Sequence, residues 1–317
     1  IPDLNTRDPI TVEIVRNRIA SVMAEMEYRF YRSGYSTIVR ESRDFSCVIL
    51  DDAGQLVSAP PMFFHAPVYF HLARRVLALY GRDGLAPGDV VASNHPYEGS
   101  LPHAPDMAVI APIHHAGTLI GFAGSIAHKA DIGGAVPGST WGQATEMFQE
   151  GLLLPPVKLT RSGRRDPDME RLIAANSRTP ELVLGDLRAQ LGACALERER
   201  IAAICERLGV ERYRNALAAL GAGIERAFRA ALARLPDGAR EAEGFLDGDG
   251  VRADRPIGLR VRIAVDHSDP APIAFDFTGS DAPAAGPVNL RPALVEACVF
   301  QALIGALDPG LRYGDTL

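Results

Sequence analysis

Two apolar runs joined by a very short turn are the feature that most constrains the fold of this chain. Residues 107–113 and 118–126 are predominantly apolar, and His115-Ala116-Gly117 lies between them. Two such runs with a glycine-containing turn predict a β-hairpin. Because a hairpin returns the chain to the end of the sheet where it started, residues that flank its two open ends should lie close together.

Polar residues occupy both open ends of this hairpin. His103 and Asp106 precede the first strand, and His128 and Asp131 follow the second. Two imidazoles and a carboxylate at one edge of a sheet (His103, Asp106 and His128) form a suitable cage for a divalent metal. The alternative is that these side chains make hydrogen bonds that pin the loops, and the pattern alone leaves both interpretations open.

The segments before this hairpin alternate between helix and strand patterns. Asp8-Pro9 is typical of a helix start, and apolar residues at three- and four-residue steps predict one helix face as far as Tyr31, with Gly34 ending the helix. Residues 44–50 predict a strand that turns back into residues 55–57 as a second hairpin. A second amphipathic helix is expected over residues 68–80.

The segments after it are mainly helical, followed by a second β region. Residues 179–207 and 211–235 are long helical patterns interrupted at Gly209, and they predict an antiparallel helical hairpin. Residues 257–265 and 273–277 predict another β-hairpin. The final helix, residues 293–307, is apolar on most sides and is expected to be buried.

Together these patterns predict an α+β fold in three parts. Residues 1–176 form a mixed sheet and hairpin domain that carries the metal site, residues 177–236 form the helical hairpin, and residues 237–317 form a smaller β-hairpin plus helix element. A length of 317 residues with 47% hydrophobic composition is sufficient to bury the core that such a fold needs.

Composition and missing motifs exclude several function classes. A net charge of −6 argues against nucleic acid or an anionic membrane surface as the main partner. The four cysteines show no paired spacing, and neither a signal peptide nor a membrane-spanning run is visible, so a cytoplasmic protein is expected. The sequence has no GxxxxGK[ST] loop, no GxGxxG after a strand and no GxSxG elbow, so it contains no recognisable nucleotide site.

Short motifs along nearly the whole chain resemble the hydantoinase B/oxoprolinase family. They are ESRDFS at residues 41–46, NHPY at 94–97, HAPD at 103–106, AHKADIGG at 127–134, PG at 137–138, TEMFQEGLLLPPVK at 145–158, NSRTP at 176–180, GDLRAQ at 185–190 and FDFTGS at 275–280. Family members commonly have Asp in place of His95 and His in place of Pro61, and these departures affect substrate choice more than metal binding. Because family members are considerably longer, the chain is expected to cover only the first half of the family fold or somewhat more.

The resemblance implies a subunit of a hetero-oligomer whose hydantoinase A-type partner carries the ATP site. Such pairs open small cyclic amides (hydantoins, 5-oxoproline or lactams) with ATP hydrolysis, and related complexes carboxylate ketones. The family's metal site maps onto His103, Asp106 and His128, with a further carboxylate at Asp44. Ligation by nitrogen and oxygen alone suits one divalent transition metal, either Zn, Mn or Fe.

The resulting hypothesis is cyclic amide hydrolysis in two stages. The partner uses ATP to phosphorylate the amide oxygen, and the metal in this chain lowers the pKa of the water that opens the activated ring. His65 or Asp131 would orient a ligand or take a proton. Two alternatives remain: a subunit of an ATP-dependent ketone carboxylase, and a non-catalytic scaffold with a structural metal.

Overall fold

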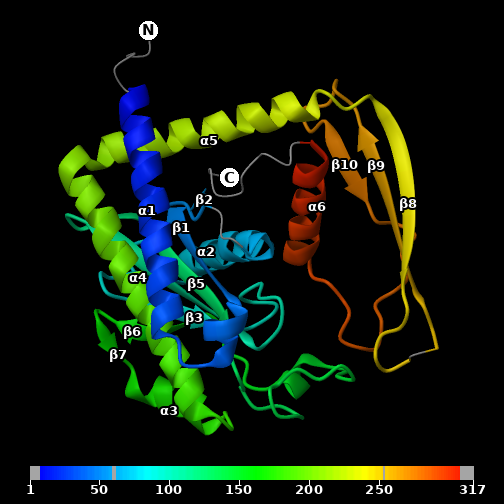
Figure 1. Cartoon of the computed structure of the whole chain (residues 1–317), viewed down its shortest axis with the longest axis horizontal. Coiled ribbons are helices and arrows are strands. Elements are labelled where there is room, and N and C mark those ends of the chain that lie inside the picture. The colour runs from blue at the N-terminus through cyan, green and yellow to red at the C-terminus, as the bar shows by residue number, and fades with distance from the viewer. Residues whose placement is uncertain (1–7, 59–61, 253, 308–317) are drawn as a thin grey trace.

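The computed structural model describes residues 8–58, 62–252 and 254–307. They form the predicted α+β fold, with one large antiparallel sheet, one small antiparallel sheet and helices around them (Figure 1). The elements in chain order are α1 Pro9–Ser33, η2 Ile38–Ser42, β1 Phe45–Asp51, β2 Leu56–Ser58, η3 Phe63–His65, α2 Ala66–Tyr80, β3 Val90–Ser93, β4 Asp106–His115, β5 Thr118–His128, η4 Met147–Glu150, β6 Val157–Arg161, β7 Arg164–Arg165, α3 Pro167–Ala175, α4 Pro180–Leu208, α5 Val210–Leu232, β8 Gly238–Leu246, β9 Ile257–Val265, β10 Ile273–Asp276 and α6 Pro292–Leu307.

The hairpin predicted from the two apolar runs is confirmed as the pair β4 and β5. These strands lie at the middle of a seven-stranded sheet with the order β2-β1-β5-β4-β3-β6-β7. Ala116 and Gly117 form the tight turn, and both have positive φ angles, of 47° and 79°. A two-residue turn of this kind matches the twist of the strands it joins. The register pairs Asp106 directly with His128, so the open end of the hairpin brings two of the predicted ligands together.

Both faces of the large sheet are covered by helices. In β1, Cys47 and Ile49 face the layer formed by α1 and α4, whereas Val48 and Leu50 face α2. Successive side chains of a strand point to opposite faces, so a strand buried on both sides is apolar throughout. This explains why β1, β4 and β5 read as continuous apolar runs rather than alternating ones.

The helix starts expected from the sequence are confirmed. Asp8 accepts a hydrogen bond from the backbone N–H of Ile10, and Pro9 occupies the first helical position of α1. This helix ends at Ser33 with Gly34 as its C-cap, which confirms the predicted end. None of the described helices combines the length and apolarity needed to cross a membrane.

The structure corrects the expected arrangement of the two long helices. They meet at Gly209 as predicted, but α5 diverges from α4 instead of lying along it, and α4 packs against α1 and the large sheet (Figure 1). Burial follows this arrangement: α4 is buried along most of its length, whereas the buried residues of α5 are confined to Tyr213 and Ala216 near its start and Ala231 and Leu232 near its end. The division into three domains stays a prediction.

The last part of the chain forms the predicted β9–β10 hairpin and one strand that was not predicted. β8 pairs with β9 along its whole length, although every residue of β8 is exposed. The predicted burial of the last helix is wrong for most of α6, because only Ala293, Ala297 and Leu303 are buried in it. One face of α6 packs on α2 and η3, and its other faces are not covered by the described residues.

Candidate metal centre

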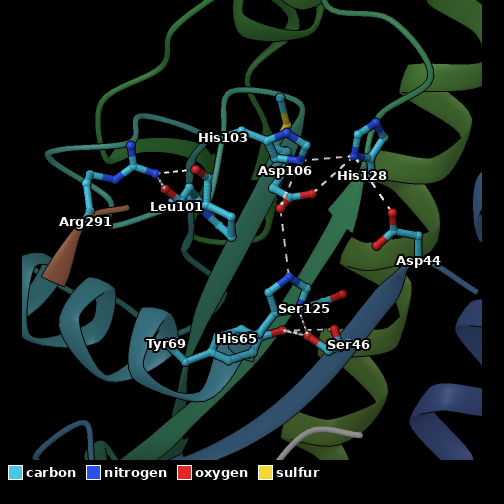
Figure 2. Close-up of polar contacts among 12 residues, drawn as sticks. Asp44, Ser46, His65, Tyr69, Leu101, His103, Asp106, Ser125, His128 and Arg291 are labelled. Atoms are coloured by element: carbon cyan, nitrogen blue, oxygen red, sulfur yellow. Dashed lines mark hydrogen bonds and ion pairs between the residues drawn. The ribbon is translucent and has the colours of Figure 1, made fainter. Parts of the chain in front are cut away.

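Three of the predicted ligands converge at the open end of the β4–β5 hairpin (Figure 2). His103 Nε2 lies 3.2 Å from Asp106 Oδ2, and His128 Nδ1 lies 3.5 Å from Asp106 Oδ1. The two imidazole nitrogens are 3.2 Å apart. One ligand atom from each residue lies within 4.8 Å of the others, so a single ion can reach all three.

The sheet register places Asp44, the fourth predicted ligand, beside His128. Asp44 lies just before β1, which runs antiparallel to β5, and the backbone N–H of His128 donates to the carbonyl of Asp44 over 3.2 Å. Asp44 Oδ2 is 3.9 Å from His128 Nδ1. The carboxylate assigned by resemblance therefore faces the group of His103, Asp106 and His128, and these four residues are called the cage below.

The charge distribution in the cage favours ionised Asp106. Burial alone raises the pKa of this carboxyl, but the adjacent imidazoles of His103 and His128 outweigh burial and hold the pKa well below its usual range. Burial lowers the pKa of His103, but the adjacent Asp106 carboxylate outweighs it, so the net pKa of His103 is raised. The centre of the cage is thus a carboxylate that attracts cations.

His65 approaches the cage from the α2 side of the sheet. Its side chain is completely buried, and its Nε2 lies 3.9 Å from Asp106 Oδ2. On the other side of the ring, Nδ1 and Ser46 Oγ are 2.7 Å apart, and Ser46 Oγ is 2.9 Å from the hydroxyl of Tyr69 (Figure 2). No local sequence pattern assigns a role to Ser46 or Tyr69, because their contacts depend on how α2 packs on β1.

The donor set fits a divalent transition metal. All the converging atoms are nitrogen or oxygen, which suits Zn, Mn or Fe. In addition, His65 Nε2 is buried without any hydrogen-bond partner among the described residues. A buried polar atom without a partner is costly, so its orientation toward the cage is consistent with a group that binds there.

Asp131 lies in the loop after β5, where it acts as an anchor. Its carboxylate accepts hydrogen bonds from the backbone N–H groups of Gly133, Gly138 and Arg178 and from the Arg178 guanidinium. Burial raises the pKa of Asp131, but these hydrogen bonds together lower it below its usual value. Both oxygens are therefore occupied, and the contacts favour the orienting role over the proton-accepting role considered for this residue.

The loop that presents His103 is held at the next residue by two side chains. Asn94 Nδ2 donates to the carbonyl of Ala104 over 2.7 Å, and Glu150 accepts from the Ala104 N–H over 3.0 Å. His95, one of the two departures from the family pattern, accepts hydrogen bonds from the N–H groups of Tyr97 and Glu98 within its own loop. Pro61, the other departure, lies outside the described residues.

Known proteins are similar to this chain in both sequence and fold. A protein of Pseudomonas sp. (strain NS671), described as the B component of a D-/L-hydantoinase, is 33% identical over 325 residues, covering 99% of this chain and 54% of that protein. The beta component of the caprolactamase of Pseudomonas jessenii is 31% identical over 258 residues, covering 81% of this chain and 43% of that protein. The chain spans about half the length of these relatives.

Two solved structures have a similar fold. The ATP-dependent caprolactamase from Pseudomonas jessenii superposes with a TM-score of 0.84 at 25% identity, over 94% of this chain and 50% of that one. The nucleotide-free structure of acetone carboxylase superposes with a TM-score of 0.83 at 18% identity, over 99% of this chain and 44% of that one. The family profile described as hydantoinase B/oxoprolinase matches residues 8–313. With the fold, the order of its motifs and this match in agreement, the chain belongs to the hydantoinase B/oxoprolinase family.

Proposed function

We propose that this chain is the metal-dependent subunit of an ATP-dependent cyclic amide hydrolase of the hydantoinase, 5-oxoprolinase or lactamase type. The observation that carries the proposal is the convergence of His103, Asp106 and His128 on one point in a chain of this family. The relatives named as components of a hydantoinase and of a caprolactamase support the substrate class, which is a small cyclic amide.

In this proposal the cage holds one divalent transition metal (Zn, Mn or Fe) through Asp44, His103, Asp106 and His128. When bound, such a metal acts as a Lewis acid and lowers the pKa of a water molecule beside it. Asp131 holds the loop that follows His128 and thereby orients that imidazole. The anchoring contacts of Asp131 with Arg178 and the backbone support this role.

The hydrogen-bond donors and acceptors around His65 support a role for this imidazole as a proton acceptor. The Tyr69 hydroxyl donates to the carbonyl of Ser46 over 2.9 Å. The Ser46 hydroxyl can then donate to the Tyr69 oxygen, and Nδ1–H of His65 can donate to Ser46 Oγ, so that every hydrogen has an acceptor. This tautomer leaves the lone pair on Nε2, on the side of Asp106, where it can accept a proton from water in the cage.

ATP chemistry belongs to a partner in this proposal. The chain has no phosphate-binding loop motif, and the names of its relatives designate them as single components of enzymes with more than one chain. We therefore propose a hetero-oligomer with a hydantoinase A-type ATP-binding subunit, which activates the amide oxygen with ATP. This chain would then add water to the activated carbon, and the ring nitrogen would take up a proton and leave as an amine when the C–N bond breaks. A second water would hydrolyse the remaining acyl phosphate to a carboxylate and inorganic phosphate.

The first test is metal content. Elemental analysis of the protein purified without added metal should find about one divalent transition ion per chain. His103→Ala and His128→Ala should each lose most of it while the far-UV circular dichroism stays unchanged. His115→Ala is the matched control, because His115 lies at the opposite end of β4 from Asp106, where it contacts Glu206, and is not part of the cage. Full metal retention in both cage variants would contradict the site.

The second test separates hydrolysis from ketone carboxylation, which the similar fold of acetone carboxylase keeps as the alternative. The chain is combined with its ATP-binding partner, and phosphate release is followed with hydantoins, 5-oxoproline, lactams and small ketones, with and without bicarbonate. Turnover of a cyclic amide without bicarbonate is expected. Bicarbonate-dependent turnover of a ketone alone would favour carboxylation, and full turnover in Asp44→Asn would favour a scaffold role with a structural metal.

A further inference from the structure

A side chain from the far end of the chain contacts the loop that carries His103. Arg291 lies directly before α6, and its guanidinium Nη2 donates to the backbone carbonyls of both Leu101 and Pro102 (Figure 2). The partners are about 190 residues apart in sequence. The guanidinium also lies over the ring of Tyr97, with 5.5 Å between its central carbon and the ring centroid.

We propose that Arg291 is a positioning residue, which holds the loop before His103 so that this imidazole stays aligned with Asp106 and His128. The inference rests on the proposed function only in taking these three residues as metal ligands. The proposal gives the region around α6 a role in the candidate metal centre, although none of the proposed metal ligands comes from that region. The role of Arg291 is indirect, since it contacts the backbone of the loop and not the metal site itself.

The chemistry of the contact suits this role. A guanidinium is planar and permanently charged, so it can bridge two carbonyl oxygens in a fixed geometry that a lysine ammonium does not reproduce. Leu101 is completely buried, which leaves its carbonyl little access to water. Removal of Arg291 would therefore leave two carbonyl groups beside His103 without their charged donor.

The loop is held from both sides of His103. On the C-terminal side, Asn94 and Glu150 bind the backbone of Ala104. On the N-terminal side, Arg291 binds the two carbonyls directly before His103. Loss of one of the two restraints should change the direction in which the imidazole points while the β4–β5 hairpin stays in place.

The test measures metal affinity and geometry rather than turnover. Arg291→Ala should weaken the binding of Co²⁺ by about 10- to 100-fold, the usual effect of removing a residue that orients a ligand. The visible absorption spectrum of the bound Co²⁺ should change as well. Arg291→Lys should recover part of the affinity, because one ammonium can reach one carbonyl. The matched control is Arg234→Ala, since Arg234 donates to the carbonyl of Leu307 at the other end of α6; its affinity and spectrum should equal those of the parent.

Hydrogen exchange of the backbone amides of Leu101, His103 and Ala104 provides the second readout, and it needs no metal. Faster exchange in Arg291→Ala than in Arg234→Ala is expected. Unchanged affinity and spectrum in Arg291→Ala would overturn the proposal. If the parent protein binds no metal, the proposed function fails, and the exchange measurement alone decides whether Arg291 holds the loop. If Arg291→Ala does not fold, the Co²⁺ affinity, spectrum and hydrogen exchange of Arg291→Lys are compared with those of Arg234→Ala instead.

Discussion

Glu197 is an unusual side chain at the scale of single residues. It lies in α4, its side chain is completely buried, and neither carboxylate oxygen has a hydrogen-bond partner among the described residues. Burial raises the pKa of Glu197 well above its usual value, since a charged carboxylate is strongly disfavoured away from water. Folding therefore favours the neutral, protonated form of this carboxyl group over its charged form.

This burial predicts how stability depends on pH. In the unfolded chain Glu197 ionises near a pKa of about 4.3. The folded state keeps the proton to higher pH, so the free energy of unfolding falls by up to about 1.4 kcal/mol per pH unit above that value, until the folded-state pKa is reached. Glu197→Gln should therefore be more stable than the parent at pH 8, by at least about 1 kcal/mol.

Urea unfolding at several pH values checks this prediction. The difference between Glu197→Gln and the parent should shrink toward zero as the pH falls to about 4. Glu199→Gln is the control, because the side chain of Glu199 is 73% exposed. A stability difference that is the same at pH 4 and pH 8 would contradict a raised pKa for Glu197.

The close contact of α2 with β5 is the important packing feature at the scale of elements. A Cβ atom at Gly124 would lie 2.7 Å from Val48 Cγ1 and 3.0 Å from Tyr69 Cε1. Glycine at this position therefore lets the Tyr69 ring lie against the sheet. Because Tyr69 binds Ser46, which in turn binds His65, this contact also positions the imidazole beside the cage.

Gly124→Ala should therefore destabilise the protein by about 1 to 3 kcal/mol, the usual effect of overpacking a core. The control is Gly192→Ala in α4, where an added Cβ would meet nothing within 4 Å. That substitution should be neutral or stabilise by up to about 1 kcal/mol, since alanine is the better helix former. Denaturant unfolding of both variants measures the difference, and equal stability of the two would show that the Tyr69 contact is looser than the structure indicates.

The candidate metal centre is assembled from distant segments at the scale of the whole molecule. The cage residues come from β1, β4 and β5 and their adjoining loops, His65 comes from η3, and Arg291 comes from the start of α6 (Figure 2). A contact of 3.0 Å between His71 Nε2 and Glu296 Oε2 also joins α2 to α6. Movement of α6 should therefore affect the loop before His103 through Arg291 and the region of His65 through α2.

The prediction at the scale of the whole molecule concerns the proposed assignment of ATP binding to the partner subunit. Calorimetric titration of the isolated chain with Mg-ATP should show no binding, because the sequence contains no phosphate-binding loop. ATP hydrolysis should depend on the ATP-binding partner and increase when this chain and a cyclic amide are added. The partner with Mg-ATP alone is the control. Tight ATP binding by the isolated chain would contradict the assignment of ATP to the partner.

The sequence by itself determined those features that depend on local pattern. Asp8 and Pro9 mark the start of α1, and the apolar runs on either side of Ala116-Gly117 predict the hairpin. A hairpin joins neighbours in sequence, so the meeting of His103, Asp106 and His128 follows from local geometry and could be expected in advance.

Only the tertiary structure decided the contacts between distant segments. The direction of α5, the exposed strand β8 and the incomplete burial of α6 depend on which apolar faces find a partner, which periodicity does not specify. The same holds for the Ser46–His65–Tyr69 contacts and for Arg291, whose partners are about 190 residues away. The physical reason is that such contacts form only when packing closes long loops of chain, and no local pattern in the sequence encodes that closure.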